Sequence, residues 1–172
     1  MPKIHESVVP LICEQITLEL NNARFYWECY EYMFRNYANN FASFYKEQAH
    51  DEISHFEKSL EHLVKRGRIY DGGNIVPPKR FLEAGKTPIE IFWEPLEAAA
   101  GKEHATTEII KKIIKAADEV HDYATVTFYE DMLLNQVEEE YEFHKLMRMV
   151  DGIIKSGNTG VLYSTAFPVV GV

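Results

Sequence analysis

The sequence predicts an all-α fold, a four-helix bundle in which one long crossover joins the second and third helices. Apolar residues recur at the three- and four-residue spacing of a helix face over four long stretches, and loop-forming residues crowd one central segment. The length of 172 residues fits one domain spanning residues 1–172. We expect helices at about 6–35, 40–67, 88–117 and 121–151, a crossover at 68–87, and a tail at 156–172 with one short helical segment near 161–166.

The segments between the predicted helices contain residues that end helices. Residues 35–40 predict a turn, with Asn39 or Asn40 available to cap the second helix. Residues 68–87 include tandem glycines and a Pro-Pro pair, so we expect a long irregular connection there. A return over the whole bundle needs about 45 Å, and the roughly 20 residues available reach about 66 Å when extended. The second and third helices can therefore run parallel.

Side chains of metal-ligand type interrupt or flank the apolar stripe of every predicted helix. A lone acid on a helix is usually solvated, so the position of each one in the stripe matters more than its presence. These side chains are Glu19 in the first helix, Glu52 and His55 in the second, Glu103 in the third, and Gln136 and Glu139 in the fourth.

The acids can be tested for a common height in the bundle. In an antiparallel pair of helices, residues at equal height lie equally far from the turn, so their midpoint in sequence falls inside it. The midpoint of Glu19 and Glu52 lies at the start of the turn predicted over 35–40. The midpoint of Glu103 and Glu139 is residue 121, in the second predicted turn. We therefore expect all four acids to meet at one level.

Four carboxylates in a dry core repel one another and lose hydration unless cations neutralise them. Two divalent ions are the simplest remedy. Oxygen-rich ligation with a single imidazole suits iron or manganese better than structural zinc, which favours thiolates and several histidines. Glu52 and His55 stand three residues apart on one helix, so Glu52 can bridge two ions beside the imidazole.

Several candidate residues also have ordinary interpretations. Tyr26 lies seven residues after Glu19 on the same face, and its spacing is equally consistent with a core tyrosine and with a redox role. His104 and His144 are interpreted as surface residues or as neighbours of the site. Glu138 lies in an acidic run that forms a solvated helix face, where it can hold a passing ion.

Over residues 6–165 the sequence resembles the bacterial non-haem ferritins. The resemblance rests on the segments Thr17-Leu18-Glu19-Leu20, Tyr26, residues 48–55 (QAHDEISH), Lys102-Glu103, residues 135–140 (NQVEEE) and Gly160-Val161-Leu162-Tyr163. It implies that two Fe²⁺ ions are oxidised by O₂ or H₂O₂ and that ferric mineral is deposited inside a homo-oligomeric shell of 24 subunits. It also implies roles: Glu19 and His55 hold the first iron, Glu52 bridges, Glu103 and Glu139 hold the second, Gln136 hydrogen-bonds nearby, and Tyr26 lies against the site.

The resemblance also separates this chain from related classes. Bacterioferritins carry a histidine ligand where this chain has Glu139 and a haem-binding methionine where it has Ile53, so no haem is expected. Rubrerythrins need a second ExxH unit and a rubredoxin cysteine set, and the two cysteines of this chain cannot supply that set. The family's third iron site would use Asp51, Glu138 and Glu139, but Asn135 departs from it. The tail containing Pro168 poorly matches the family's short fifth helix, and Asp131 replaces an aromatic residue that some members carry.

Composition limits the partners. The net charge of −9 disfavours nucleic acid and anionic membranes and favours cations. No apolar run is long enough to span a bilayer and no export signal is apparent, so we expect a cytoplasmic protein. Cys13 and Cys29 are too far apart for a CxxC site and are expected to be reduced thiols.

The leading hypothesis is therefore an iron-storage subunit with ferroxidase activity. The alternatives are a di-iron protein that removes peroxide or oxygen with little storage, and a non-catalytic helical bundle whose core acids bind no redox metal.

Overall fold

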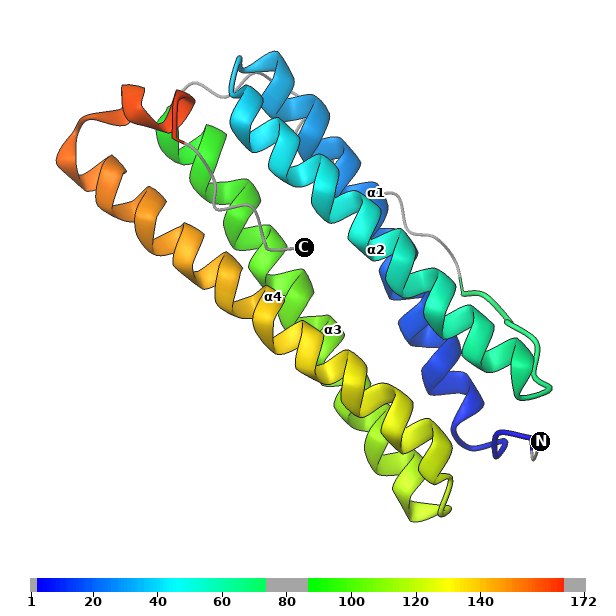
Figure 1. The fold of residues 1–172 in the computed structure, drawn as a ribbon. Helices are drawn as coiled ribbons and strands as arrows, with labels where there is room; N and C mark the ends of the chain where they lie inside the picture. Colours follow the sequence, from blue (N-terminus) through cyan, green and yellow to red (C-terminus); the bar gives the residue numbers. More distant parts are fainter. Residues whose placement is uncertain (1–2, 74–86, 166–172) are drawn as a thin grey trace.

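A computed structural model describes residues 3–73 and 87–165. Two antiparallel hairpins lie side by side, α1 with α2 and α3 with α4, and α1 also packs against α3 (Figure 1). This arrangement confirms the predicted four-helix bundle. The part of the crossover at residues 74–86 lies outside the described residues, as does the tail from residue 166. The elements are α1 (Val9–Arg35), α2 (Asn39–Lys65), a π-helical turn η1 (Ile89–Trp93), α3 (Glu94–Glu119), α4 (Tyr123–Ser156) and a 3₁₀ turn η2 (Thr159–Tyr163).

Proline positions explain where α1 and α3 begin. The first helix was expected from residue 6 but starts at Val9, because Pro10 has no N–H and fits only the first helical turn. Pro95 stands at the same place in α3. The segment before it forms the π-helical turn η1, in which the N–H of Glu94 donates to the carbonyl of Ile89. The expected helix from residue 88 is thus an α-helix preceded by a π turn.

The fourth helix is longer than expected, ending at Ser156 instead of residue 151. Gly152 does not end this helix and lies inside it, where a Cβ added to the glycine would meet nothing within 4 Å. The helix ends at Gly157, whose φ of 75° places it in the left-handed region favoured at a helix C-terminus. The short segment after it is the 3₁₀ turn η2, slightly earlier than the predicted 161–166.

Neither asparagine expected to cap the second helix does so. The N-cap of α2 is Ala38, and no side chain forms a capping hydrogen bond there. The residue before it, Tyr37, has a φ of 61°. Asn40 instead donates from Nδ2 to the carbonyls of Leu162 and Thr165, each at 2.8 Å. This asparagine therefore attaches η2 and the segment just after it to the start of α2.

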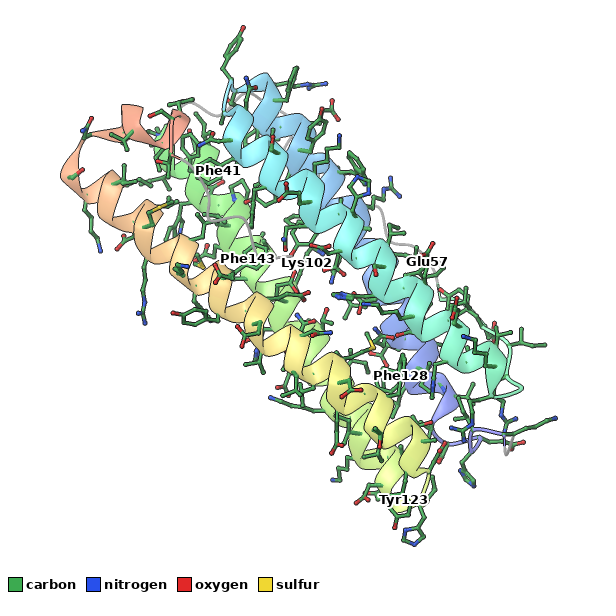
Figure 2. The ribbon with its side chains drawn as sticks, in the orientation of Figure 1. Phe41, Glu57, Lys102, Tyr123, Phe128 and Phe143 are labelled. Atoms are coloured by element: carbon green, nitrogen blue, oxygen red, sulfur yellow. The ribbon has the colours of Figure 1, made fainter. Side chains whose placement is uncertain are left out.

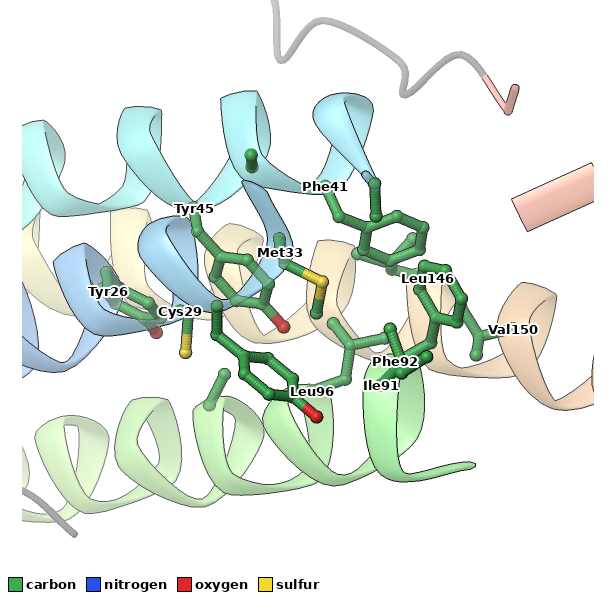
Figure 3. Close-up of a cluster of buried hydrophobic side chains, with 14 of the residues drawn as sticks. Tyr26, Cys29, Met33, Phe41, Tyr45, Ile91, Phe92, Leu96, Leu146 and Val150 are labelled. Carbon is green, nitrogen blue, oxygen red and sulfur yellow. The ribbon is translucent and has the colours of Figure 1, made fainter. Parts of the chain in front are cut away.

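The buried apolar side chains form two clusters, one toward each end of the bundle. Figure 3 shows part of the first, in which Tyr26, Tyr45, Phe92 and Leu96 fill the space between the helices. On every helix the buried members of the two clusters are separated by a stretch that contributes no buried residue to either cluster. These stretches lie between Ile16 and Phe25, Ala49 and Leu63, Ala99 and Ile109, and Met132 and Phe143. A polar layer therefore crosses the middle of the bundle.

A buried ion pair joins the two hairpins at the end occupied by the α3–α4 turn. Arg66, just after α2, places Nη2 2.9 Å from Oδ1 of Asp122, and the two side chains are only 5% and 9% exposed. Asp122 also caps α4 by accepting from the backbone N–H of Thr125 at 3.3 Å. Within residues 3–73 and 87–165, no helix is both long and apolar enough to cross a membrane.

Candidate metal centre

Three side chains of the polar layer meet in one buried group. Glu19 on α1 and Glu52 and His55 on α2 each offer a ligand atom, and these atoms lie within 4.8 Å of one another. Glu52 and His55 face the same way because they stand three residues apart on a helix. Glu19, Glu52 and His55 are 0%, 3% and 8% exposed, so water is largely excluded from the group. Figure 2 shows the side chains of the bundle as sticks on the ribbon.

Glu103 on α3 completes the layer from the other hairpin. The hydroxyl of Tyr26 donates to its Oε1. From α4, Nε2 of Gln136 donates to its Oε2 at 2.6 Å and approaches its backbone carbonyl at 3.3 Å. Glu103 is 1% exposed, and its charge acts to raise the pKa of Glu52. The two hairpins therefore bring their acids together, as the turn midpoints predicted.

Glu139 on α4 lies at the edge of this group. Its Oε1 is 3.4 Å from Nε2 of His55, and its side chain is 25% exposed. Burial raises the pKa of Glu139 to about 9, with a further contribution from the charges of Glu103 and Glu19. Glu139 is thus the most accessible of the five ionisable groups.

The electrostatics of the group favour a bound cation. Burial raises the pKa of Glu19 to about 7 and that of Glu52 well above its usual range, where the neighbouring Glu19 adds to the effect. Burial lowers the pKa of His55 to about 4, so its imidazole is neutral and able to ligate a metal. Oε2 of Glu19 and Oε2 of Glu52 are buried with no hydrogen-bond partner. Such oxygens are costly to bury unless a cation or proton satisfies them.

Of the residues expected for a third ion, Glu139 lies at the edge of this compact group, and the others are exposed. Asp51 and Glu138 are exposed, and Asn135 is exposed as well. The charge of Asp51 contributes to raising the pKa of Glu139, which places this aspartate near the rim. His104 is 66% exposed on its side chain and has Nδ1 4.0 Å from Oε2 of Glu140. His144 is exposed too, as predicted.

The sequence interpretation overlooked Gln15, which is fully buried on α1. Its Nε2 donates to Oε1 of Glu19 at 2.5 Å, and its Oε1 accepts from the hydroxyl of Tyr129 at 3.4 Å. The four-residue spacing of Gln15 and Glu19 was a usable signal, because residues one helical turn apart are neighbours on a face. Tyr129 was assigned only to the apolar stripe of the fourth helix.

Comparison with known proteins agrees with this architecture. A curated bacterial non-heme ferritin from Bacteroides fragilis is 27% identical over 162 residues, covering 93% of this chain and 94% of the relative. A ferritin from Chlorobium tepidum superposes with a TM-score of 0.78 at 24% identity, covering 93% of both chains. An open pore ferritin from Archaeoglobus fulgidus gives a TM-score of 0.82 at 21% identity, covering 94% of both chains.

The family model described as the ferritin-like domain matches residues 11–153. The match includes all five ionisable groups of the polar layer. The chain belongs to the ferritin-like domain family.

Proposed function

We propose that this protein is an iron-storage subunit with ferroxidase activity, which oxidises Fe²⁺ to Fe³⁺ with O₂ or H₂O₂ and deposits ferric mineral inside a multimeric shell. The observation that carries the proposal is the buried group of Glu19, Glu52 and His55, in which both acids have an unpartnered oxygen. Glu103 and Glu139 lie beside this group. Membership of the ferritin-like family supports the iron-handling role.

The ligand set matches the chemistry of iron. Carboxylate oxygens are hard ligands, and one neutral imidazole beside them suits iron or manganese. Carboxylates stabilise Fe³⁺ more than Fe²⁺ because the electrostatic attraction grows with the charge of the ion. Oxidation of two Fe²⁺ ions releases two electrons, which reduce O₂ to H₂O₂ with the uptake of two protons.

We assign two ions to the group. Glu19 and His55 hold the first, Glu52 bridges, and Glu103 with Glu139 holds the second. Gln136 orients Glu103, and Tyr26 lies against the site with its hydroxyl on the same carboxylate. Asp51 and Glu138 remain the candidates for a weaker third position at the rim. No haem is assigned, because Glu139 and Ile53 stand where a haem-binding relative carries histidine and methionine.

We further propose a homo-oligomeric shell of 24 subunits in the cytoplasm. The relatives in the comparisons are named as ferritins, which supports a storage assembly. The free, buried thiols of Cys13 and Cys29 fit a reducing compartment.

Anaerobic titration with Fe²⁺ followed by exposure to air tests the activity. The expected result is binding of two Fe²⁺ per subunit and rapid growth of ferric absorbance. The variant Glu52→Ala/His55→Ala should lose both. Glu57→Ala/His144→Ala, which removes the same residue types from exposed positions, should behave like the wild type. Iron oxidation that survives in the Glu52/His55 variant would contradict the proposal.

Storage is tested separately by the size of the native particle and by electron microscopy after iron loading. A hollow particle with an electron-dense core is expected. A small particle that consumes Fe²⁺ and peroxide without forming a core would instead support a detoxifying protein.

A further inference from the structure

Glu19 is held by a chain of two hydrogen bonds that starts on the opposite hairpin. The hydroxyl of Tyr129 on α4 donates to Oε1 of Gln15 at 3.4 Å, and Nε2 of Gln15 donates to Oε1 of Glu19 at 2.5 Å. All three side chains are 0% exposed. Water therefore does not compete for these hydrogen bonds, which strengthens them in a low-dielectric core.

The hydrogen bonds from Gln15 and Tyr129 leave the two oxygens of Glu19 with different surroundings. Oε1 is engaged by Gln15, whereas Oε2 is buried without a partner. Both oxygens of Glu103, in contrast, accept hydrogen bonds from side chains. A carboxylate held at one oxygen keeps a fixed plane and presents the other oxygen in a defined direction, which suits monodentate ligation.

Tyr129 sets which end of the Gln15 amide faces the acid. With a cation bound, Glu19 is an ionised carboxylate that only accepts hydrogen bonds, so the NH₂ group of Gln15 faces Glu19 and its carbonyl faces away. The Tyr129 hydroxyl satisfies that carbonyl. Burial raises the pKa of Tyr129 well above its usual value, so this hydroxyl remains protonated across the physiological range. Loss of the hydroxyl would leave the buried carbonyl of Gln15 unsatisfied.

We infer that Gln15 and Tyr129 are positioning residues, which fix the Glu19 carboxylate so that Oε2 is presented to the first metal ion. This inference rests on the proposed function, since it assigns Glu19 as a ligand. Neither residue touches the ion. Their effect on binding and oxidation is transmitted through Glu19 alone, with Tyr129 acting through Gln15.

A purely structural role makes a different prediction. Buried amides and hydroxyls are normally paired, so these hydrogen bonds could serve only the stability of the fold. In that case, removing them would lower the melting temperature without changing the affinity for metal. The readout must therefore include metal binding to the assembled apoprotein as well as stability.

The variants Gln15→Met, Tyr129→Phe and the double variant separate the two roles. Methionine approximates the length of glutamine without its amide, and phenylalanine removes only the hydroxyl. The dissociation constant of Co²⁺ is measured anaerobically from its visible absorption, and kcat and KM for Fe²⁺ oxidation are measured in parallel. Gln15→Met should weaken Co²⁺ binding by about 10-fold to 100-fold, the usual effect of losing a partner of a metal ligand. Tyr129→Phe should weaken it by a smaller factor.

The double variant tests the order of the chain. If Tyr129 acts through Gln15, adding Tyr129→Phe to Gln15→Met changes the Co²⁺ affinity no further. A matched control is Asn22→Leu, because Asn22 is an equally buried amide on α1 that donates to Thr106 rather than to an acid. This control should lower the melting temperature and leave the Co²⁺ affinity and spectrum unchanged.

Wild-type Co²⁺ affinity in Gln15→Met would overturn the inference whatever the melting temperature, and an additive loss in the double variant would overturn the role of Tyr129. If Gln15→Met fails to fold, an unchanged Co²⁺ affinity in Tyr129→Phe is sufficient to reject the positioning role of the two residues. A wild-type protein that binds neither Co²⁺ nor Fe²⁺ would contradict the proposed function itself. The two failures are therefore distinguishable.

Discussion

Gln136 and Glu103 connect α4 to α3 through a buried hydrogen bond, in which Nε2 of the glutamine donates to Oε2 of the acid at 2.6 Å. Tyr26 donates to the other oxygen from α1. Glu103 is thus held from two helices at once. Its orientation is set before any ion binds, which reduces the reorganisation that binding requires.

Replacing Gln136 with leucine should weaken the metal position that includes Glu103. Leucine preserves the approximate volume but removes the donor, and loss of such a partner typically reduces metal affinity by about 10-fold to 100-fold. Anaerobic titration should then show one tight and one weakened Fe²⁺ per subunit. Gln48→Leu, at a half-buried amide on α2, is the control and should bind both ions tightly. Two tight ions in the Gln136 variant would exclude this role.

The polar layer could be predicted from sequence because a helix has a fixed rise and period. Glu19 and Glu52 lie equally far from one turn, as do Glu103 and Glu139 from the other, so helix geometry alone places them at one level. The structure brings these acids together, with His55 within reach of Glu139. Binding of iron by these residues remains a prediction.

The residues that support the acids were harder to predict. Gln15 lies on the same face as Glu19, but its hydrogen bond to Tyr129 joins positions 114 residues apart and depends on how the two hairpins pack. The helix ends depended on local features that periodicity does not show. Gly152 and Gly157 look equivalent in sequence, and only their backbone conformations separate the helical glycine from the terminating one.

The stability of the metal-free protein should fall as the pH rises from 7 to 8.5. In the unfolded chain, a glutamate is already ionised at pH 7, whereas burial raises the pKa of Glu139 to about 9 in the folded chain. The folded state therefore holds a proton that unfolding releases, and stability present at low pH is lost as the pH approaches 9. The slope from one such group is at most about 1.4 kcal/mol per pH unit.

Urea unfolding at several pH values measures this slope. Glu139→Gln should make the dependence shallower, and Glu130→Gln, at an exposed acid of the same helix, should leave it unchanged. Divalent cation should reverse the trend, because the bound ion favours the ionised carboxylates. A slope that is the same in the wild type and in Glu139→Gln would show that Glu139 is not protonated in the folded apoprotein.

Removing one partner of the buried ion pair between Arg66 and Asp122 should destabilise the protein strongly. Arg66→Met leaves the Asp122 carboxylate, which is 9% exposed, with its hydrogen bonds from Thr125 but without a cationic partner. Breaking a buried ion pair in this way costs about 3–5 kcal/mol. Lys65→Met is the control, since Lys65 pairs with Glu61 where both side chains are more than 60% exposed. That change should cost less than about 1 kcal/mol.

Chemical denaturation compares the two variants. Similar losses in both would mean that the buried pair contributes no more than an exposed one. The pair lies at the end of the bundle, far along the helices from the polar layer, so the folded Arg66 variant should keep its Co²⁺ affinity.

Replacing Gly152 and Gly157, near the C-terminal end of α4, by alanine should change the stability of the protein in opposite directions. Gly152 lies inside α4 with nothing within 4 Å of a Cβ added there, so Gly152→Ala should stabilise the helix by about 0.5–1 kcal/mol. Gly157 has equally open surroundings but a φ of 75°, a conformation that costs an alanine about 1 kcal/mol or more. Because space is available at both positions, the difference between them reports backbone conformation alone. The midpoint of urea unfolding should rise in the first variant and fall in the second, and a stabilised Gly157→Ala protein would place the end of α4 beyond this glycine.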